Sequence, residues 1–282
     1  MIHGNMLSNS KGSIMSKSSK YILAGGCSFT DKDFASVHHP EMDVSFPKWP
    51  EILGEYCGLD VVNQGKCGRG NDWITNTLTK TILKDHKNIE MVVVGWTEIW
   101  RFSAYNHYTF NPLLALFRPD RKLSEIQEKS RELFKHMFKE DMLDPHYTKE
   151  WPSLFEVHIK SWVDNMLQIQ ELCKLLDIKY IMAPICGAIT LQKYNQCLPS
   201  IGRELSATAI QWAVMFGSVD GLYDLKANHY IGHPFLDDFG GFVVQDMLTP
   251  KLRISNVDPH PNAEGHELIA RKFYEQYTKV YA

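Results

Sequence analysis

Short apolar segments that alternate with amphipathic helical patterns constrain the fold of this chain more than any other feature of its sequence. The apolar segments cover residues 20–25, 59–63, 90–95 and 178–185. Between the second and the third, Ile74, Leu78 and Ile82 recur every four residues, which is typical of one face of a helix. Strands that are apolar on both faces and alternate with such helices favour a parallel sheet covered on both sides. The sequence therefore predicts an α/β fold, a three-layer α/β/α sandwich with a parallel, flavodoxin-like sheet.

Two later segments, residues 155–176 and 263–279, repeat the helical spacing. Their apolar faces consist of Ile159, Trp162, Met166, Ile169, Cys173 and Leu176 in the first and of Ile269, Phe273 and Tyr277 in the second. The helix that starts near residue 71 is expected to be capped by Asn71 or Asp72, because both side chains can accept a hydrogen bond from the first turn. These segments supply the helices that a sandwich needs.

The chain is predicted to form a single domain over residues 19–282, preceded by a disordered extension at residues 1–18. Two stretches, at about 101–154 and 186–247, interrupt the alternation and are predicted to be insertions. The second insertion holds a predicted helix near 200–215. Both insertions follow the carboxyl ends of strands, where open α/β sheets bind their ligands.

Charge and hydropathy argue against several classes of partner. The formal net charge of −3 carries no basic excess of the kind that nucleic-acid-binding proteins show. No apolar run approaches the roughly 20 residues needed to cross a bilayer, and the N-terminus lacks the apolar core of a signal peptide. The six cysteines include no Cys-x-x-Cys pair. We therefore expect a cytoplasmic protein with reduced thiols that binds neither nucleic acid nor membrane.

Three strand ends carry residues suited to chemistry. Gly25-Gly26-Cys27-Ser28 ends the first strand, the glycine-rich NQGKCGRGND follows the second, and VDPHPNAEGHE precedes the last helix with Asp258 and His260. A serine hydroxyl needs a histidine to accept its proton, and the histidine needs a carboxylate to hold its tautomer. Backbone N–H groups of a glycine turn at a helix N-terminus suit a developing oxyanion. Together these residues predict an acyl-transfer site.

The same motifs resemble the SGNH (GDSL-type) hydrolase family from about residue 20 to the end, apart from the two insertions. The resembling segments are GGCSFT, FPKWPEILGEYCGLDVVNQG, the Asn-x-Gly-x-x-Gly pattern of Asn63, Gly65 and Gly68, and DPHPNAEGH. The resemblance implies that Ser28 is the nucleophile, His260 the base and Asp258 the acid that orients it. It further implies that the N–H groups of Ser28 and Gly68 bind the oxyanion.

The sequence departs from the family pattern in three places. Cys27 replaces the usual aspartate before the serine, and we expect its side chain to point away from the chemistry. Thr97 stands where the third block usually has an asparagine that completes the oxyanion hole, and its hydroxyl could donate to the oxyanion from a shorter side chain. Asp258 and His260 are separated by one residue, whereas the family usually has two. The Gly-Cys-Ser-Phe-Thr and Trp-Thr-x-x-x-Arg patterns are similar to a divergent branch that is associated with bacteriophage genomes.

The sequence is therefore interpreted as a serine esterase that hydrolyses a small acyl ester, with an O-acetyl group on a carbohydrate as one candidate substrate. Trp96 and Arg101 are predicted substrate contacts; Arg101 could instead form a salt bridge with a residue of the first insertion. No cofactor or metal is required, although His229 and His233 have a spacing that would also suit zinc. An O-acyltransferase, or a catalytically weakened domain that binds glycans or belongs to a virion, stays open, as does the oligomeric state.

Overall fold

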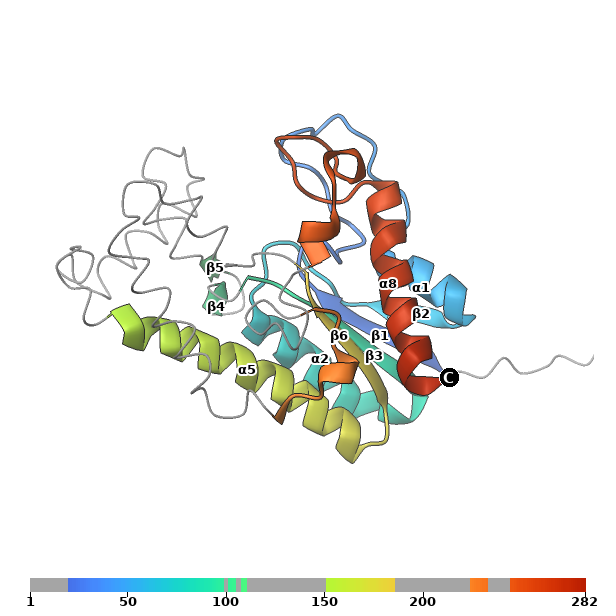
Figure 1. Cartoon of the computed structure of the whole chain (residues 1–282), viewed down its shortest axis with the longest axis vertical. Helices are drawn as coiled ribbons and strands as arrows, with labels where there is room; N and C mark the ends of the chain where they lie inside the picture. The colour runs from blue at the N-terminus through green and yellow to red at the C-terminus, as the bar shows by residue number, and fades with distance from the viewer. Residues whose placement is uncertain (1–19, 99–100, 105–107, 111–150, 186–223, 233–243) are drawn as a thin grey trace, which may run out of the picture.

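A computed structural model describes residues 20–98, 101–104, 108–110, 151–185, 224–232 and 244–282 (Figure 1). The predicted extension at residues 1–18 and the predicted helix near 200–215 lie outside these residues. The single domain with two insertions stays a prediction.

Four parallel strands form the central sheet. They are β1 (Tyr21–Gly26), β2 (Asp60–Asn63), β3 (Ile89–Trp96) and β6 (Lys179–Pro184), in the spatial order β2-β1-β3-β6. Each strand lies within one residue of its predicted bounds. The order is the one in which a flavodoxin-like sheet begins, with the first strand between the second and the third. All four carboxyl ends therefore lie at one edge of the sheet.

Helices cover both faces of this sheet, as Figure 1 shows. They are α2 (Asn71–Asp85) and α5 (Trp151–Leu175) on one face and α1 (Trp49–Cys57) and α8 (Ala263–Tyr281) on the other. Successive residues of β3 divide between two cores: Val92 and Val94 pack with α2 and α5, and Met91 and Val93 pack with α1 and α8. This division is what a strand buried on both faces requires, and it confirms the predicted three-layer sandwich.

The helix bounds differ from the predicted ones mainly at α5. This helix begins at Trp151, four residues before the predicted start and inside the stretch assigned to the first insertion. Its predicted apolar face is buried at Trp162, Met166, Ile169 and Cys173. The C-terminal helix α8 runs two residues further than predicted.

The predicted cap of α2 is wrong. The N-cap residue is Gly70, and no side chain caps the helix. Asn71 is instead turned toward the end of β3, where its Oδ1 accepts from the Thr97 N–H at 3.0 Å and its Nδ2 donates to the carbonyls of Thr97 and Glu98 at 3.3 and 3.1 Å. Because its amide is engaged with β3, Asn71 joins the helix to the strand rather than to its own first turn.

Shorter elements complete the described part of the chain. They are the antiparallel strands β4 (Phe102–Ala104) and β5 (Tyr108–Phe110) and the 3-10 segments at His86–Asn88, Ala227–His229, Val244–Met247 and Pro250–Leu252. Tyr230 bridges Met182 of β6 in parallel, and the Ile231 N–H donates to the Met182 carbonyl at 2.9 Å. This part of the second predicted insertion therefore packs against the open edge of the sheet.

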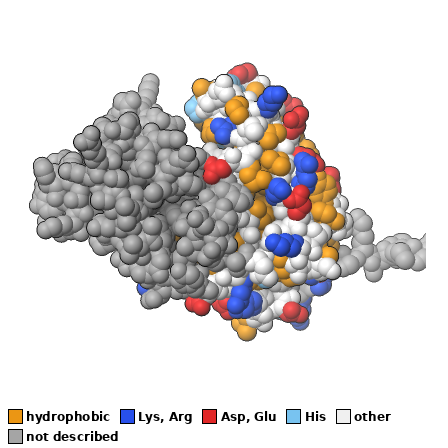
Figure 2. All heavy atoms as spheres, viewed as in Figure 1, with side chains coloured by type: hydrophobic (Ala, Val, Ile, Leu, Met, Phe, Trp, Pro, Cys, Tyr) orange, Lys and Arg blue, Asp and Glu red, His pale blue; other side chains and the backbone are white. Residues whose placement is uncertain are grey.

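The surface of the described residues carries mixed charge. Figure 2 shows Lys and Arg interspersed with Asp and Glu on the visible face, without a continuous band of one sign. No helix in the described ranges is long and apolar enough to cross a membrane.

Close packing at the end of β1 generates a first prediction. A Cβ on Gly26 would lie 2.1 Å from the Thr30 Oγ1 and 3.0 Å from the Gly95 carbonyl oxygen, whereas a Cβ on Gly58 would meet nothing within 4 Å. Gly58 instead has a φ of +66°, so Gly58→Ala adds backbone strain of about 1 kcal/mol. We expect Gly26→Ala to lower the free energy of unfolding by about 3 kcal/mol, because two neighbours must move. Urea unfolding of both variants tests this, and an equal or smaller loss for Gly26→Ala would contradict it.

Candidate active site

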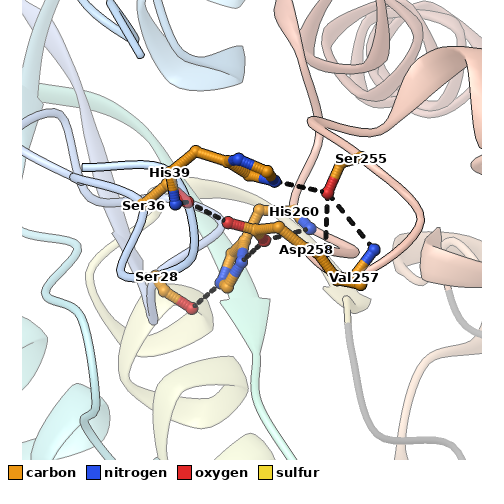
Figure 3. Close-up of polar contacts among 7 residues, drawn as sticks. All are labelled: Ser28, Ser36, His39, Ser255, Val257, Asp258 and His260. Carbon is orange, nitrogen blue, oxygen red and sulfur yellow. Dashed lines mark hydrogen bonds and ion pairs between the residues drawn. The ribbon is translucent and has the colours of Figure 1, made fainter. Parts of the chain in front are cut away.

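Ser28 lies two residues beyond β1, in a tight turn. The Thr30 and Asp31 N–H groups both donate to the Cys27 carbonyl, at 2.9 and 3.0 Å. The Cys27 side chain is fully buried in the core under α1 and α8, as expected for a residue that points away from the chemistry. The turn leaves the Ser28 hydroxyl 2.8 Å from Nε2 of His260 (Figure 3).

His260 lies in the loop before α8 and is held on several sides. Its Nδ1 is 2.6 Å from Oδ1 of Asp258. Its ring packs against the rings of Phe29 and Phe34, with centroid distances of 4.9 and 4.3 Å. These aromatic contacts restrict rotation of the imidazole, so Nε2 stays directed at Ser28.

Asp258 is a buried carboxylate with a hydrogen-bond donor on each oxygen. Oδ1 accepts from the backbone N–H of His260 at 3.1 Å as well as from its ring, and Oδ2 accepts from the Ser36 hydroxyl at 2.5 Å. Burial raises the pKa of this carboxyl, but the hydrogen bonds from Ser36 and His260 outweigh burial and lower the pKa below its usual value. Asp258 is therefore ionised at neutral pH.

The one-residue spacing between Asp258 and His260 is compatible with this geometry because the loop turns tightly. The Ser255 hydroxyl accepts from the N–H groups of Val257 and Asp258, and the Ser255 N–H donates to the Asp258 carbonyl. The aspartate can thus reach the ring and the backbone N–H of a residue only two positions later.

These three side chains form a continuous hydrogen-bonded chain from Ser28 through His260 to Asp258. Such a chain can pass the serine proton to the imidazole while the carboxylate stabilises the imidazolium that forms. The predicted nucleophile, base and acid are therefore brought together by the fold.

Gly68 lies in a turn between β2 and α2, at a backbone conformation that favours glycine. The Arg69 N–H donates to the Lys66 carbonyl at 3.3 Å, and Gly68 has a φ of +77°. Within the described residues, the backbone N–H groups of Ser28 and Gly68 donate to no protein acceptor. Both are therefore available to a ligand, as an oxyanion hole would require.

The turn after β2 is joined to the turn after β1 by hydrogen bonds of two polar side chains, those of Asp31 and Asn63. Asp31 accepts from the Cys67 N–H at 2.8 Å and from the Asp33 N–H at 3.0 Å. The Asn63 amide donates to the Thr30 carbonyl at 2.8 Å, and its oxygen accepts from the Gly65 N–H at 2.8 Å. Gly68 is thereby tied, one residue away, to the segment that carries Ser28.

Thr97 follows β3, whose residue Gly95 pairs with Gly26 of β1 in the sheet register. Its backbone is held by Asn71, and the residue is 2% exposed. The register brings Thr97 to the same edge of the sheet as the Ser28 turn. A role for its hydroxyl in an oxyanion hole stays a prediction.

The predicted substrate contacts have other positions. Trp96 is fully buried in the core with α2 and α5, because the alternation of β3 turns it to the same face as Val92 and Val94. It therefore belongs to the core, and we withdraw it as a substrate contact. Arg101 pairs with Glu98, Nη2 to Oε2 at 2.9 Å, so one of its interactions is with a residue that precedes the predicted insertion. Contact between Arg101 and substrate stays a prediction.

Two further histidines, His266 and His229, pack against neighbouring residues of the fold. His266 accepts the Trp49 N–H at 3.2 Å at the start of α1, and burial, with the charges of Lys48 and His260, lowers its pKa to about 3. His266 is therefore part of the packing between α1 and α8. His229 stacks on Tyr180, with centroids 4.4 Å apart, and its predicted zinc partner His233 lies outside the described residues.

Sequence reasoning did not find Ser36, Asp31 or the role of Asn71. Ser36 lies 222 positions from Asp258, and nothing in the residues around it marks it as a partner of that carboxylate. Asp31 lies three residues after Ser28, and an acidic residue so close to a predicted nucleophile is a signal that could have drawn attention to it.

The fold and this site define an α/β/α protein with a serine, a histidine and an aspartate in hydrogen-bond contact. No family model matches the chain, and no curated protein matches it in sequence.

Solved structures similar to the chain include three from bacteria. One is the psychrotrophic esterase EstA from Pseudoalteromonas sp., with 11% identity, a TM-score of 0.41, and coverage of 93% of this chain and 98% of that one. Another is a catalytic mutant of Axe2, an acetylxylan esterase from Geobacillus stearothermophilus, with 15% identity, a TM-score of 0.38 and coverage of 92% and 94%. A G-D-S-L family protein from Desulfitobacterium hafniense DCB-2 has 15% identity, a TM-score of 0.35 and coverage of 91% and 99%.

The lowered pKa of Asp258 predicts a pH-dependent contribution to stability. A carboxyl whose pKa is lower in the folded than in the unfolded state stabilises the fold above its unfolded value, near 3.8, and this stabilisation is lost as the pH falls through the folded value. Wild type should therefore be more stable than Asp258→Asn at pH 7, and the difference should shrink below about pH 4. Urea unfolding across this range measures it, with the exposed Asp33→Asn as control. A difference that stays constant with pH would contradict the assignment.

Proposed function

We propose that this protein is a serine hydrolase that cleaves a small acyl ester, with Ser28, His260 and Asp258 as its catalytic triad. The observation that carries the proposal is the unbroken pair of hydrogen bonds, 2.8 Å from Ser28 Oγ to His260 Nε2 and 2.6 Å from His260 Nδ1 to Asp258 Oδ1. Both distances are within the range over which a proton can pass.

In the first half of the reaction, Ser28 Oγ attacks the carbonyl carbon of the ester while His260 takes the hydroxyl proton. The negative charge that develops on the carbonyl oxygen is bound by the N–H groups of Ser28 and Gly68, with the Thr97 hydroxyl as a further candidate donor. The bond to the alcohol oxygen then breaks, and His260 returns the proton to the departing alcohol. An acyl group is left on Ser28.

In the second half, water attacks the acyl carbon and gives its proton to His260. The bond to Ser28 breaks, the carboxylic acid leaves and the proton returns to the serine oxygen. The buried, ionised Asp258 stabilises the imidazolium in both halves, because a charge of opposite sign lies 2.6 Å from Nδ1. These steps need only the chain's own residues and water.

An O-acetyl group on a carbohydrate is one substrate within this proposal. The triad determines the reaction at the acyl carbon of the ester. A panel of substrates would identify the alcohol from which the acyl group is removed. The panel contains p-nitrophenyl acetate, longer p-nitrophenyl esters and a peracetylated sugar. Release of acetate from the sugar ester would support this substrate class.

The proposal predicts that wild type hydrolyses p-nitrophenyl acetate and that Ser28→Ala loses activity on the order of 10³-fold or more, because no other group can carry the acyl intermediate. Release of p-nitrophenol measures both rates. The matched control is Ser45→Ala, which changes an exposed serine in the loop between β1 and α1 and should retain wild-type activity.

Folding of each variant is checked by its unfolding midpoint. Folded wild-type protein that cleaves no ester of the panel would overturn the proposal and favour the binding-module alternative. Equal activity in Ser28→Ala would show that another residue is the nucleophile.

A further inference from the structure

Two loops that are far apart in sequence meet behind the triad. The first joins β1 to α1 (residues 27–48), and the second leads into α8 (residues 253–262); they run side by side in Figure 1. Figure 3 shows two polar contacts that cross between them, from Ser36 to Asp258 and from His39 to Ser255. The first of these contacts reaches a proposed catalytic residue directly.

The direction of the Ser36 hydrogen bond follows from its partners. Its Oγ accepts from the His39 backbone N–H at 3.0 Å and lies 2.5 Å from Asp258 Oδ2. An ionised carboxylate has no proton to give, so the Ser36 hydroxyl must donate its hydrogen to Asp258. The backbone N–H of His39 favours this orientation because it occupies the acceptor side of the same oxygen.

The hydrogen bond from Ser36 gives the second oxygen of the buried Asp258 carboxylate its donor. Without it, Oδ2 would have no donor among the described residues, while Oδ1 would keep the two donors of His260. Asp258 is 1% exposed, so water does not readily replace the lost hydroxyl. The carboxylate would then be free to rotate toward other donors, and its alignment with His260 Nδ1 would loosen.

The second crossing supports the same loop. The Ser255 hydroxyl already accepts two backbone N–H groups, and it lies 2.8 Å from His39 Nε2. Its single hydroxyl hydrogen can therefore be donated to His39 Nε2. The turn that shapes the Asp258 loop is thus joined to the Ser36 loop at a second point, close to the first.

We propose that Ser36 is a positioning residue that extends the Ser28–His260–Asp258 chain to a fourth member and holds the aspartate in register with the imidazole. This inference rests on the proposed function. Ser36 is 3% exposed and contacts Asp258, so it acts through the aspartate rather than on the substrate.

A double-mutant cycle tests the proposal with p-nitrophenyl acetate. Ser36→Ala should lower kcat about 10-fold or more, since a hydrogen bond to a charged group is lost. KM should stay within about 2-fold, because the substrate does not touch Ser36. In an Asp258→Ala background, Ser36→Ala should cost nothing further in kcat, because its target is absent.

Two variants serve as controls. Ser36→Thr keeps the hydroxyl and should restore most of the kcat lost in Ser36→Ala, and Ser45→Ala changes a serine of the same loop outside the network. An equal loss of kcat from Ser36→Ala in both backgrounds would overturn the proposal, because it would indicate a general structural role. An unchanged kcat in Ser36→Ala would overturn it as well.

A measurement that needs no turnover separates this inference from the proposed function. The proton between His260 Nδ1 and Asp258 Oδ1 should give a downfield proton resonance in NMR spectra that disappears in Asp258→Ala. Ser36→Ala should shift this resonance, and Ser36→Thr should return it toward the wild-type position. An unshifted resonance in Ser36→Ala would overturn the role of Ser36. If the wild-type protein were inactive, the proposed hydrolase function would be overturned, and the NMR resonance would still decide whether Ser36 positions Asp258.

Discussion

The buried carboxylate of Asp258 is the interaction on which the geometry of the site depends. An ionised carboxylate is costly to bury unless its oxygens accept hydrogen bonds. Here the donors come from two distant loops, Ser36 after β1 and His260 before α8. Satisfying the charge therefore joins the loop that follows Ser28 to the loop that carries His260, and the imidazole lies at hydrogen-bonding distance from Ser28.

The sheet makes this arrangement possible because all four strands are parallel and end at one edge. Ser28, Gly68 and Thr97 follow three adjacent strands, β1, β2 and β3. Because these strands are parallel neighbours, the three residues lie at the same edge of the sheet although they are far apart in the sequence. Hydrogen bonds between the turns then fix their relative positions. Asp31 and Asn63 tie the turn after β2 to the turn after β1 through backbone N–H and carbonyl groups.

Much of the fold and part of the site could be predicted from the sequence. The physical reason for the strands differs from the reason for the site residues. The strands were found within one residue because buried parallel strands are continuous apolar runs bounded by polar or glycine residues. Ser28, Asp258 and His260 were predicted to lie together because acyl-transfer chemistry needs these residue types and because the motifs resemble a known family; their catalytic roles stay a proposal. Their hydrogen bonds are present in the structure.

The remaining features depend on tertiary contacts that leave no local pattern. Asn71 looks like a helix cap in sequence, but the end of β3 offers its amide three hydrogen bonds. Trp96 looks like a cleft aromatic near a strand end, but strand alternation turns it into the core. Ser36 meets Asp258 only after the chain has folded, and a serine in a loop carries no signal of that partner.

The central claim is that Ser28 is the nucleophile activated by His260, and covalent labelling tests it most directly. Wild-type protein would be treated with a fluorophosphonate probe, digested, and the modified peptide sequenced by mass spectrometry. The account predicts a single adduct on Ser28 that is absent in His260→Ala, because the serine needs the imidazole to accept its proton. Folded wild-type protein that takes no label, or an adduct on another residue, would contradict it.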